Sequence, residues 1–182
     1  VTTAESRVFW DVQGASEYTP SLADIAFNYW ATNLRSDLYP SKGVVPPYMP
    51  DSTTGVVTGA TSTTLEKYFN PKNDPANWPH LVQYMVTLGV PGKLTYSSDV
   101  DCVDATNDLC KLRRGQTNST GKAGWTAPQN NDPTGIDDTW HAAINSRGDY
   151  FNAANPQNLV DQLTNILTNA VHRYPRNPQL WV

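Results

Sequence analysis

Apolar positions recur at helical spacing after Ser21 and predict a helix that runs to about Leu34. Its apolar face would consist of Leu22, Ile25, Ala26, Tyr29 and Trp30. Ser21 suits the N-cap position, because its hydroxyl can accept a hydrogen bond from an exposed N–H group of the first turn. Asp24, three residues later, completes the pattern of a capping box.

Two more helices are predicted in the last third of the chain. The first runs from Ile136 to Ser146, with Gly148 placed to end it. The second follows Asn155, a cap residue, and Pro156, which suits the first turn. It has the most regular pattern in the chain, formed by Leu159, Val160, Leu163, Ile166, Leu167 and Ala170.

Two segments have the composition of strands. Residues 81–89 are apolar and β-branched without strict alternation, which is typical of a strand buried on both faces. Residues 150–153 are a shorter candidate. The order strand, helix, strand, helix predicts an α/β fold with a parallel sheet flanked by helices. Two strands are too few to make a stable sheet alone. Either the loops contain further strands or this chain is part of a larger domain, and we favour the larger domain.

Two long segments, 39–79 and 91–135, are rich in Pro, Gly, Ser or Asn and follow neither period. They predict loop excursions. We expect residues 1–171 to belong to one domain, consistent with the chain length. Residues 172–182 contain two prolines and are expected to form a tail or linker.

Composition narrows the function classes. The chain carries 16% charged residues and a net charge of −4, and its longest basic run is Arg113-Arg114. Nucleic-acid binding requires clustered positive charge, so this class is excluded. No apolar run approaches the ~18 residues of a membrane span.

The two cysteines, Cys102 and Cys110, lie close together in a polar segment. This spacing favours a local disulfide in an exported protein over free thiols. A zinc site is least favoured, since no histidine lies nearby. Acidic residues in the same segment are weak calcium candidates, with a solvated acidic loop as the simpler interpretation. They are Asp99, Asp101, Asp104 and Asp108.

Asp137, Asp138 and His141 are the residues that could support catalysis. Neighbouring helical residues point about 100° apart, so the two carboxylates would not share a substrate. First-turn acids that favour the helix dipole are the simpler interpretation. His141 lies three residues after Asp138 and could act as a general base in a secreted hydrolase. No Gly-x-Ser-x-Gly motif accompanies it, and a structural histidine is favoured.

Two short motifs also have structural interpretations. Arg147-Gly148-Asp149 spells the tripeptide recognised by integrins, but Gly148 as a helix C-cap explains it adequately. Asn118-Ser119-Thr120 fits the N-glycosylation sequon, which a polar loop can contain by chance.

Three segments, in the same order, resemble signatures of the type IV pilus tip adhesin and biogenesis factor family of PilC/PilY type. The longest, over residues 136–151, reads IDDTWHAAINSRGDYF. Residues 22–38 read LADIAFNYWATNLRSDL, and residues 78–92 read WPHLVQYMVTLGVPG. Together these segments anchor the resemblance over residues 20 to 170.

The resemblance implies the C-terminal half of a von Willebrand factor A-type domain, which is a Rossmann-like α/β fold. It implies a non-enzymatic role at the pilus tip, outside the bacterial cell, in pilus assembly, surface attachment and surface sensing. The implied partners are minor pilins, other tip components, and a host-cell or abiotic surface. A stand-alone soluble binding domain is the alternative among non-enzymes.

The metal-binding pattern Asp-x-Ser-x-Ser of such domains does not occur in this sequence. No metal or catalytic residue is therefore carried over, and no cofactor is expected in this segment, although the full-length protein could hold calcium or magnesium. The signature residues are expected to serve the fold; they are Asp137, Asp138, Trp140, His141, Arg147 and Gly148. Surface recognition is expected in the two excursions, above all in the cysteine loop.

Overall fold

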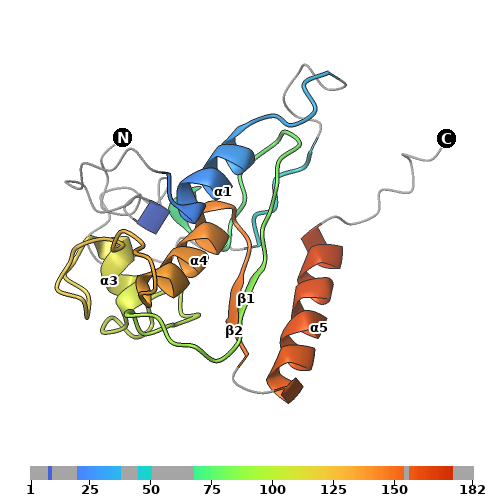
Figure 1. Cartoon of the computed structure of the whole chain (residues 1–182). Coiled ribbons are helices and arrows are strands. Elements are labelled where there is room, and N and C mark those ends of the chain that lie inside the picture. The colour runs from blue at the N-terminus through green and yellow to red at the C-terminus, as the bar shows by residue number, and fades with distance from the viewer. Residues whose placement is uncertain (1–7, 10–19, 38–44, 51–67, 154–155, 174–182) are drawn as a thin grey trace.

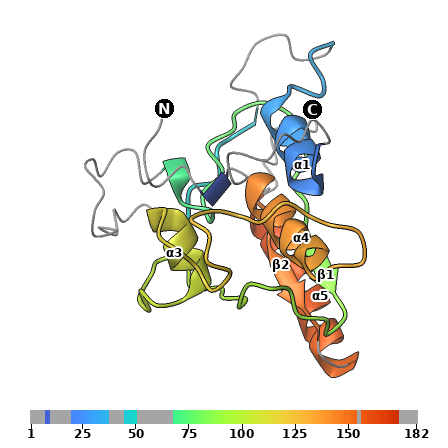
Figure 2. The same ribbon diagram turned by 60° about the vertical axis from the view of Figure 1, so that its left-hand side comes forward.

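The computed structural model describes residues 8–9, 20–37, 45–50, 68–153 and 156–173. Its elements are α1 (Leu22–Ala31), β1 (Met85–Thr87), α3 (Asp108–Arg114), α4 (Thr134–Asn145), β2 (Tyr150–Asn152) and α5 (Pro156–Arg173). Figure 1 shows α4 on one side of the two strands and α5 on the other, and Figure 2 agrees. The predicted α/β architecture is confirmed.

The two strands pair in parallel, as predicted, with Met85 opposite Tyr150. The N–H of Ala153 extends the ladder by donating to the carbonyl of Thr87 over 2.8 Å. A parallel pair needs a crossover between its strands, and here the crossover contains α3 and α4. The sheet of the described residues therefore consists of two strands with a long intervening segment.

β1 is shorter than the strand predicted over residues 81–89. The N–H of Leu81 donates to the carbonyl of Tyr29 near the end of α1 (3.2 Å). The N–H of Gln83 donates to the hydroxyl of Ser146 after α4 (3.1 Å). Because these backbone groups bond to helix ends, only the three residues of β1 pair with β2.

α1 begins as predicted. The Ser21 hydroxyl accepts from the N–H of Asp24 (3.1 Å), and the Asp24 carboxylate accepts from the N–H of Ser21 (3.0 Å), which completes the capping box. The helix ends at Ala31, three residues before the predicted end, because Thr32 takes an extended conformation.

The packed face of α1 differs from the predicted one. Ala26 and Trp30 are buried as expected, but three apolar residues of that face are at least 40% exposed, namely Leu22, Ile25 and Tyr29. Ala23 and Ala26 instead pack against Ala142 of α4. These small side chains let the two helices approach closely, and the size of the contacting residues therefore selects the face.

α4 begins at Thr134, two residues before its predicted start, and supplies the centre of the core. Trp140, Ala143 and Ile144 face inward. The other buried members of this core cluster are Val8, Leu94, Leu109, Leu112, Trp125 and Tyr150. The core therefore draws on the 91–135 excursion as much as on the regular elements.

The 91–135 excursion contains a helix, α3, that the sequence pattern did not predict. Asn107 caps it by accepting from the N–H of Cys110 (2.8 Å), and Gly115 ends it in the left-handed conformation with φ 62°. Both signals were visible in the sequence. A helix of seven residues, however, is too short to show helical periodicity clearly.

The 39–79 excursion is described at residues 45–50 and 68–79, and segments 38–44 and 51–67 lie outside the described residues. Tyr48 and Asp74 form an isolated antiparallel bridge, in which the N–H of Asp74 donates to the carbonyl of Tyr48 over 2.7 Å. This bridge ties two remote parts of the excursion together.

α5 occupies the segment with the most regular pattern, as predicted, and extends two residues past the predicted domain boundary at 171. Its expected cap, Asn155, and residues 174–182 of the predicted tail lie outside the described residues. Four apolar residues on one side of α5 are 47–70% exposed, namely Val160, Leu163, Leu167 and Val171. Among the described helices, none has the length and apolar character needed to cross a membrane.

Trp140→Ala should lower the free energy of unfolding by about 3–5 kcal/mol, because it empties the centre of the core. Trp140 is 4% exposed and its ring contacts the rings of Tyr96, Trp125 and Tyr150. Urea unfolding followed by circular dichroism measures the loss. Leu34→Ala, at an exposed position, is the control and should change stability by less than about 0.5 kcal/mol. An unchanged midpoint for Trp140→Ala would show that this side chain does not hold the core.

Candidate functional site

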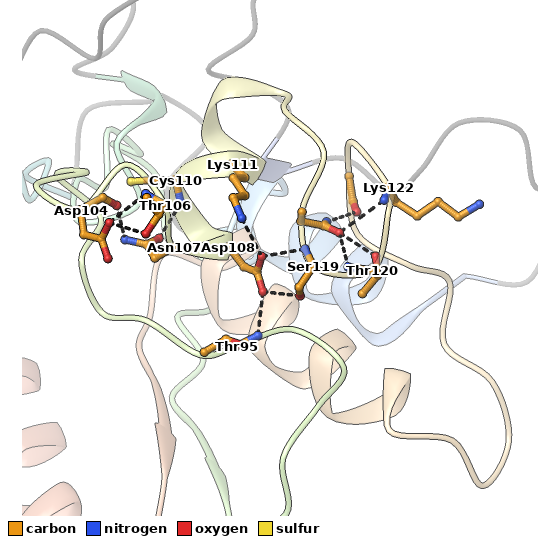
Figure 3. Close-up of polar contacts among 12 residues, drawn as sticks. Thr95, Asp104, Thr106, Asn107, Asp108, Cys110, Lys111, Ser119, Thr120 and Lys122 are labelled. Atoms are coloured by element: carbon orange, nitrogen blue, oxygen red, sulfur yellow. Dashed lines mark hydrogen bonds and ion pairs between the residues drawn. The ribbon is translucent and has the colours of Figure 1, made fainter.

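A disulfide joins Cys102 to Cys110 and fastens a short loop to the first turn of α3, which confirms the predicted pairing. The Cα atoms are 5.3 Å apart. Cys110 is fully buried, whereas Val103, next to Cys102, is 91% exposed. The disulfide therefore anchors an exposed apolar side chain to a buried helix, and Figure 3 shows the polar contacts around Cys110.

Two acidic residues fold this loop upon itself. The Asp99 carboxylate accepts from the N–H groups of Val103 (3.2 Å) and Asp104 (2.8 Å) and from the Asn107 side-chain amide (3.1 Å). Asp104 accepts from the hydroxyl (2.6 Å) and the N–H (2.8 Å) of Thr106. These two bonds, the hydroxyl first, lower the pKa of Asp104. The loop is thus shaped by its own hydrogen bonds as well as by the disulfide.

Asp108 connects α3 to the segments on either side of it (Figure 3). Its buried carboxylate accepts from the N–H of Thr95 (2.8 Å) and from the hydroxyl (2.5 Å) and N–H (2.9 Å) of Ser119. The ammonium of Lys111 lies 4.0 Å away. Burial acts to raise the pKa of Asp108, but these bonds outweigh it and the pKa is lowered.

The four calcium candidates do not converge. Asp101 pairs with Lys72, Asp108 turns inward, and Asp99 and Asp104 accept from loop N–H groups. Within the described ranges, no group of three or more His, Cys, Asp or Glu side chains is arranged to hold a metal ion. The calcium hypothesis therefore finds no ligand set in this loop.

Asp138 of α4 caps a different helix. Its carboxylate accepts from the N–H of Leu22 (2.9 Å) and the N–H of Ala23 (3.2 Å), in the first turn of α1. Those N–H groups have no partner within their own helix, and the positive end of the helix dipole favours a carboxylate there. The sequence interpretation attached Asp138 to the dipole of its own helix, and the structure corrects this to the dipole of α1.

Asp137 holds a third segment. Its carboxylate accepts from the N–H groups of Lys93 (3.1 Å) and Leu94 (3.2 Å). A Cβ atom at Gly92 would lie 1.9 Å from an oxygen of the Asp137 carboxylate, so any larger residue there would displace this carboxylate. Burial raises the pKa of Asp137 more than the two backbone bonds lower it. The adjacent carboxylates of α4 thus reach two segments far apart in the sequence.

His141 is enclosed in the core and is 1% exposed. Its ring stacks on Trp125, with centroids 4.5 Å apart and 10° between the planes. Asp138, its expected partner in the hydrolase hypothesis, directs its carboxylate to the N-terminus of α1. This geometry presents no accessible Asp–His pair to a substrate.

At the end of α4, one residue takes the left-handed conformation, and the next residue lies close to the backbone of Gln83. Arg147, not the expected Gly148, takes the left-handed conformation, with φ 61°. The N–H of Gly148 donates to Ala143 (2.9 Å) and that of Arg147 to Ile144 (3.0 Å), which forms a Schellman motif. Gly148 is required for another reason, because a Cβ there would lie 1.8 Å from the carbonyl oxygen of Gln83.

The first residue of each short recognition motif is buried. The Arg147 side chain is buried, with its guanidinium carbon 3.9 Å from the ring centre of Phe9 and 4.9 Å from that of Trp30. An integrin could not reach it without unfolding this region. Asn118 of the sequon is also buried, and its side-chain amide donates to the carbonyl of Gly124 (3.0 Å).

A buried polar network at the C-terminal end of α1 was not anticipated. The Asp74 carboxylate accepts from the indole N–H of Trp30 (3.0 Å) and faces Nε2 of His80 at 2.8 Å. Nδ1 of His80 faces the carbonyl of Trp78 at 2.6 Å, and the indole of Trp78 donates to the carbonyl of Trp30 (2.9 Å). Trp30 and His80 belong to signature segments, but Asp74 lies in a predicted loop. The sequence therefore contained no indication that the three side chains contact one another.

An open hollow of about 680 Å³ lies at the N-terminal ends of α1 and α4. Its walls come from residues 20–22, residues 128–133, Val90 and Ile136. Val90 follows β1, so the hollow lies near the carboxyl end of that strand, where parallel sheets commonly bind ligands. The 91–135 excursion thus contributes part of its wall.

Comparison with known proteins identifies relatives in Pseudomonas aeruginosa, each named type IV pilus biogenesis factor PilY1. The protein of strain PAK is 33% identical over 177 residues, 89% of this chain and 13% of its own length. That of strain PAO1 is 35% identical over 149 residues, 81% of this chain and 11% of its own length. That of strain UCBPP-PA14 is 34% identical over 160 residues, which are 87% of this chain and 12% of its own length. No family model and no solved structure matches the chain.

Asp137 and Asp108 predict pH dependences of opposite sign. The raised pKa of Asp137 gives a contribution to stability that is complete below its usual value of 3.8 and is lost as pH rises through the raised pKa. The lowered pKa of Asp108 gives a contribution that is present above 3.8 and is lost as pH falls through the lowered pKa.

Urea unfolding of the wild type, Asp137→Asn and Asp108→Asn from acid to neutral pH separates the two groups. The free energy of unfolding of the wild type minus that of Asp137→Asn should fall as pH rises, because the buried carboxylate ionises. The same difference for Asp108→Asn should rise. Each variant is the control for the other, and slopes of the same sign would contradict the assigned environments.

Proposed function

Because this chain belongs to the PilY1-type family of type IV pilus biogenesis factors, we propose that it is a non-enzymatic module of a pilus-tip protein at the bacterial surface. In this proposal the module supports pilus assembly, attachment to surfaces and the sensing of surface contact. The observation that carries the proposal is the match over 81–89% of the chain.

The geometry of the signature residues supports a non-enzymatic role. Asp137 and Asp138 accept from backbone N–H groups, His141 stacks in the core, and Arg147 lies against aromatic rings. Polar side chains that hold a fold in this way are unavailable to a substrate. The hydrolase alternative therefore gains no support from the residues on which it was based.

The proposed fold is the C-terminal part of a von Willebrand factor A-type domain, with the remaining strands supplied by a longer polypeptide. The chain spans 11–13% of the length of the relatives it matches. Sheets of two strands are marginally stable, and parallel sheets normally have both faces covered. Further strands beside β1 or β2 would complete such a sheet.

The exposed apolar sides of two helices support this completion. Leu22 and Ile25 on α1, and Leu163 and Leu167 on α5, are 40–68% exposed. α1 packs against α4 on one side of the sheet, and α5 lies on the other (Figure 1). Added strands would lie between these two layers and cover apolar surface of this kind, since burial is the main source of stability for such faces.

Surface recognition is proposed for the loop closed by Cys102 and Cys110, where Val103 is the most exposed large hydrophobic residue among those the structure describes. Its partners would be minor pilins, other tip components, or a host-cell or abiotic surface. A local disulfide suits export through the oxidising periplasm. The segment is proposed to hold no cofactor, and a calcium or magnesium ion in the full-length protein would bind elsewhere.

Val103→Asp in the full-length protein should lower surface attachment several-fold and leave the amount of pili unchanged, because it places a charge at the tip of the loop. Leu34→Asp makes the same change at an exposed apolar residue outside the loop and is the control. Adherent cells are counted, and sheared pili are immunoblotted with an antibody to this segment.

The immunoblot also distinguishes a pilus protein from a stand-alone domain. The proposal predicts a band far above 20.1 kDa in the pilus fraction. A 20.1 kDa band in the medium or cytoplasm would contradict the pilus assignment. Normal attachment by Val103→Asp, with pili present, would contradict recognition by the disulfide loop.

A further inference from the structure

Both ring nitrogens of His80 face hydrogen-bond acceptors. Nδ1 lies 2.6 Å from the carbonyl oxygen of Trp78, and Nε2 lies 2.8 Å from a carboxylate oxygen of Asp74. A carbonyl cannot donate, so Nδ1 must carry a hydrogen. If Asp74 is ionised, Nε2 must carry one as well, and the ring is then an imidazolium.

The surroundings of Asp74 favour its ionised form. Its other carboxylate oxygen accepts from the indole N–H of Trp30 (3.0 Å) and from the backbone N–H of Ala76 (3.2 Å). Hydrogen bonds donated to a carboxylate stabilise the charged form. A carboxyl group is also intrinsically more acidic than an imidazolium, so a proton shared by Asp74 and His80 resides on the ring.

We propose that His80 is held as a buried imidazolium at neutral pH, and that its ion pair with Asp74 is a pH-sensitive latch between α1 and the chain entering β1. The side chains of the two residues are 3% and 5% exposed. The inference rests on the contacts of the described residues and is independent of the proposed pilus function.

The latch closes on the C-terminal end of α1. The indole of Trp78, beside His80, donates to the carbonyl of Trp30, and the N–H of Leu81 donates to the carbonyl of Tyr29. Both carbonyls belong to the last turn of α1, which is the negative end of the helix dipole. A positive ring in this position is favoured by the dipole as well as by Asp74.

Asp74 and Arg147 are charged side chains that contact this cluster. Asp74, on the same segment as His80, favours the imidazolium through a direct hydrogen bond. Arg147 comes from the turn after α4 and contacts the ring of Trp30. Its positive charge disfavours the imidazolium form of His80. The Asp74 carboxylate acts on the His80 ring directly, at 2.8 Å from Nε2, whereas Arg147 reaches this cluster through the ring of Trp30.

The sign of the pH effect follows. An imidazolium with two acceptors is stabilised by folding, so the folded protein holds this proton more tightly than the unfolded chain. The stabilisation is complete below the pKa of a histidine in the unfolded chain, about 6.5. This stabilisation is lost as the pH rises through the pKa of His80 in the folded protein. A neutral ring has one N–H and must give up either Trp78 or Asp74, which loosens the end of α1.

Nitrogen-15 NMR of the histidine rings tests the latch directly. The chain has three histidines, and His80→Gln identifies the signals of His80. The wild-type ring should show two protonated nitrogens at slightly alkaline pH. A His80 ring with only one protonated nitrogen at neutral pH would overturn the proposal, and this result requires no destabilised variant.

Asp74→Asn tests the cause of the effect. It should make His80 release its proton at a lower pH than in the wild type. Asp101→Asn removes the exposed partner of Lys72 and is the matched control, which should leave the His80 titration unchanged. If the His80 titration in Asp74→Asn equals that of the wild type, the ion pair does not hold the proton and the latch is refuted.

Discussion

The rest of the structure depends on one constraint, namely that neighbouring side chains of a helix point about 100° apart. Asp137 and Asp138 use this divergence. One carboxylate accepts from the backbone after Gly92, and the other accepts from the first turn of α1. Each satisfies N–H groups that would be costly to bury without partners. α4 therefore fixes both α1 and the start of the 91–135 excursion.

This arrangement explains why a polar signature serves a fold. The inward side of α4 carries Trp140 and His141 into an aromatic core with Trp125, while its two acids hold the surrounding backbone. At its other end, Gly148 lets the chain pass close to the approach to β1. The loop that carries Val103 is held separately, by the Cys102–Cys110 disulfide and by the Asp99 carboxylate.

Local features were predictable from the sequence, and contacts between distant segments were not. The capping box of Ser21 and the helical pattern of α5 depend on residues a few positions apart, and both predictions were correct. The parallel order of the strands followed from chain connectivity. The partner of Asp138 lies 116 residues away, and the packed face of α1 depends on Ala142, so a single sequence held no signal for either.

Amide hydrogen exchange at the four N–H groups that donate to the carboxylates of Asp137 and Asp138 most directly tests the claim that α4 holds its neighbours. The account predicts protection at residues 22–23 and 93–94 in the wild type. Asp138→Ala should speed exchange chiefly at 22–23, and Asp137→Ala chiefly at 93–94, because each removes one acceptor. Rapid wild-type exchange at all four amides, or unchanged protection in both variants, would contradict the claim that α4 holds its neighbours through these two side chains.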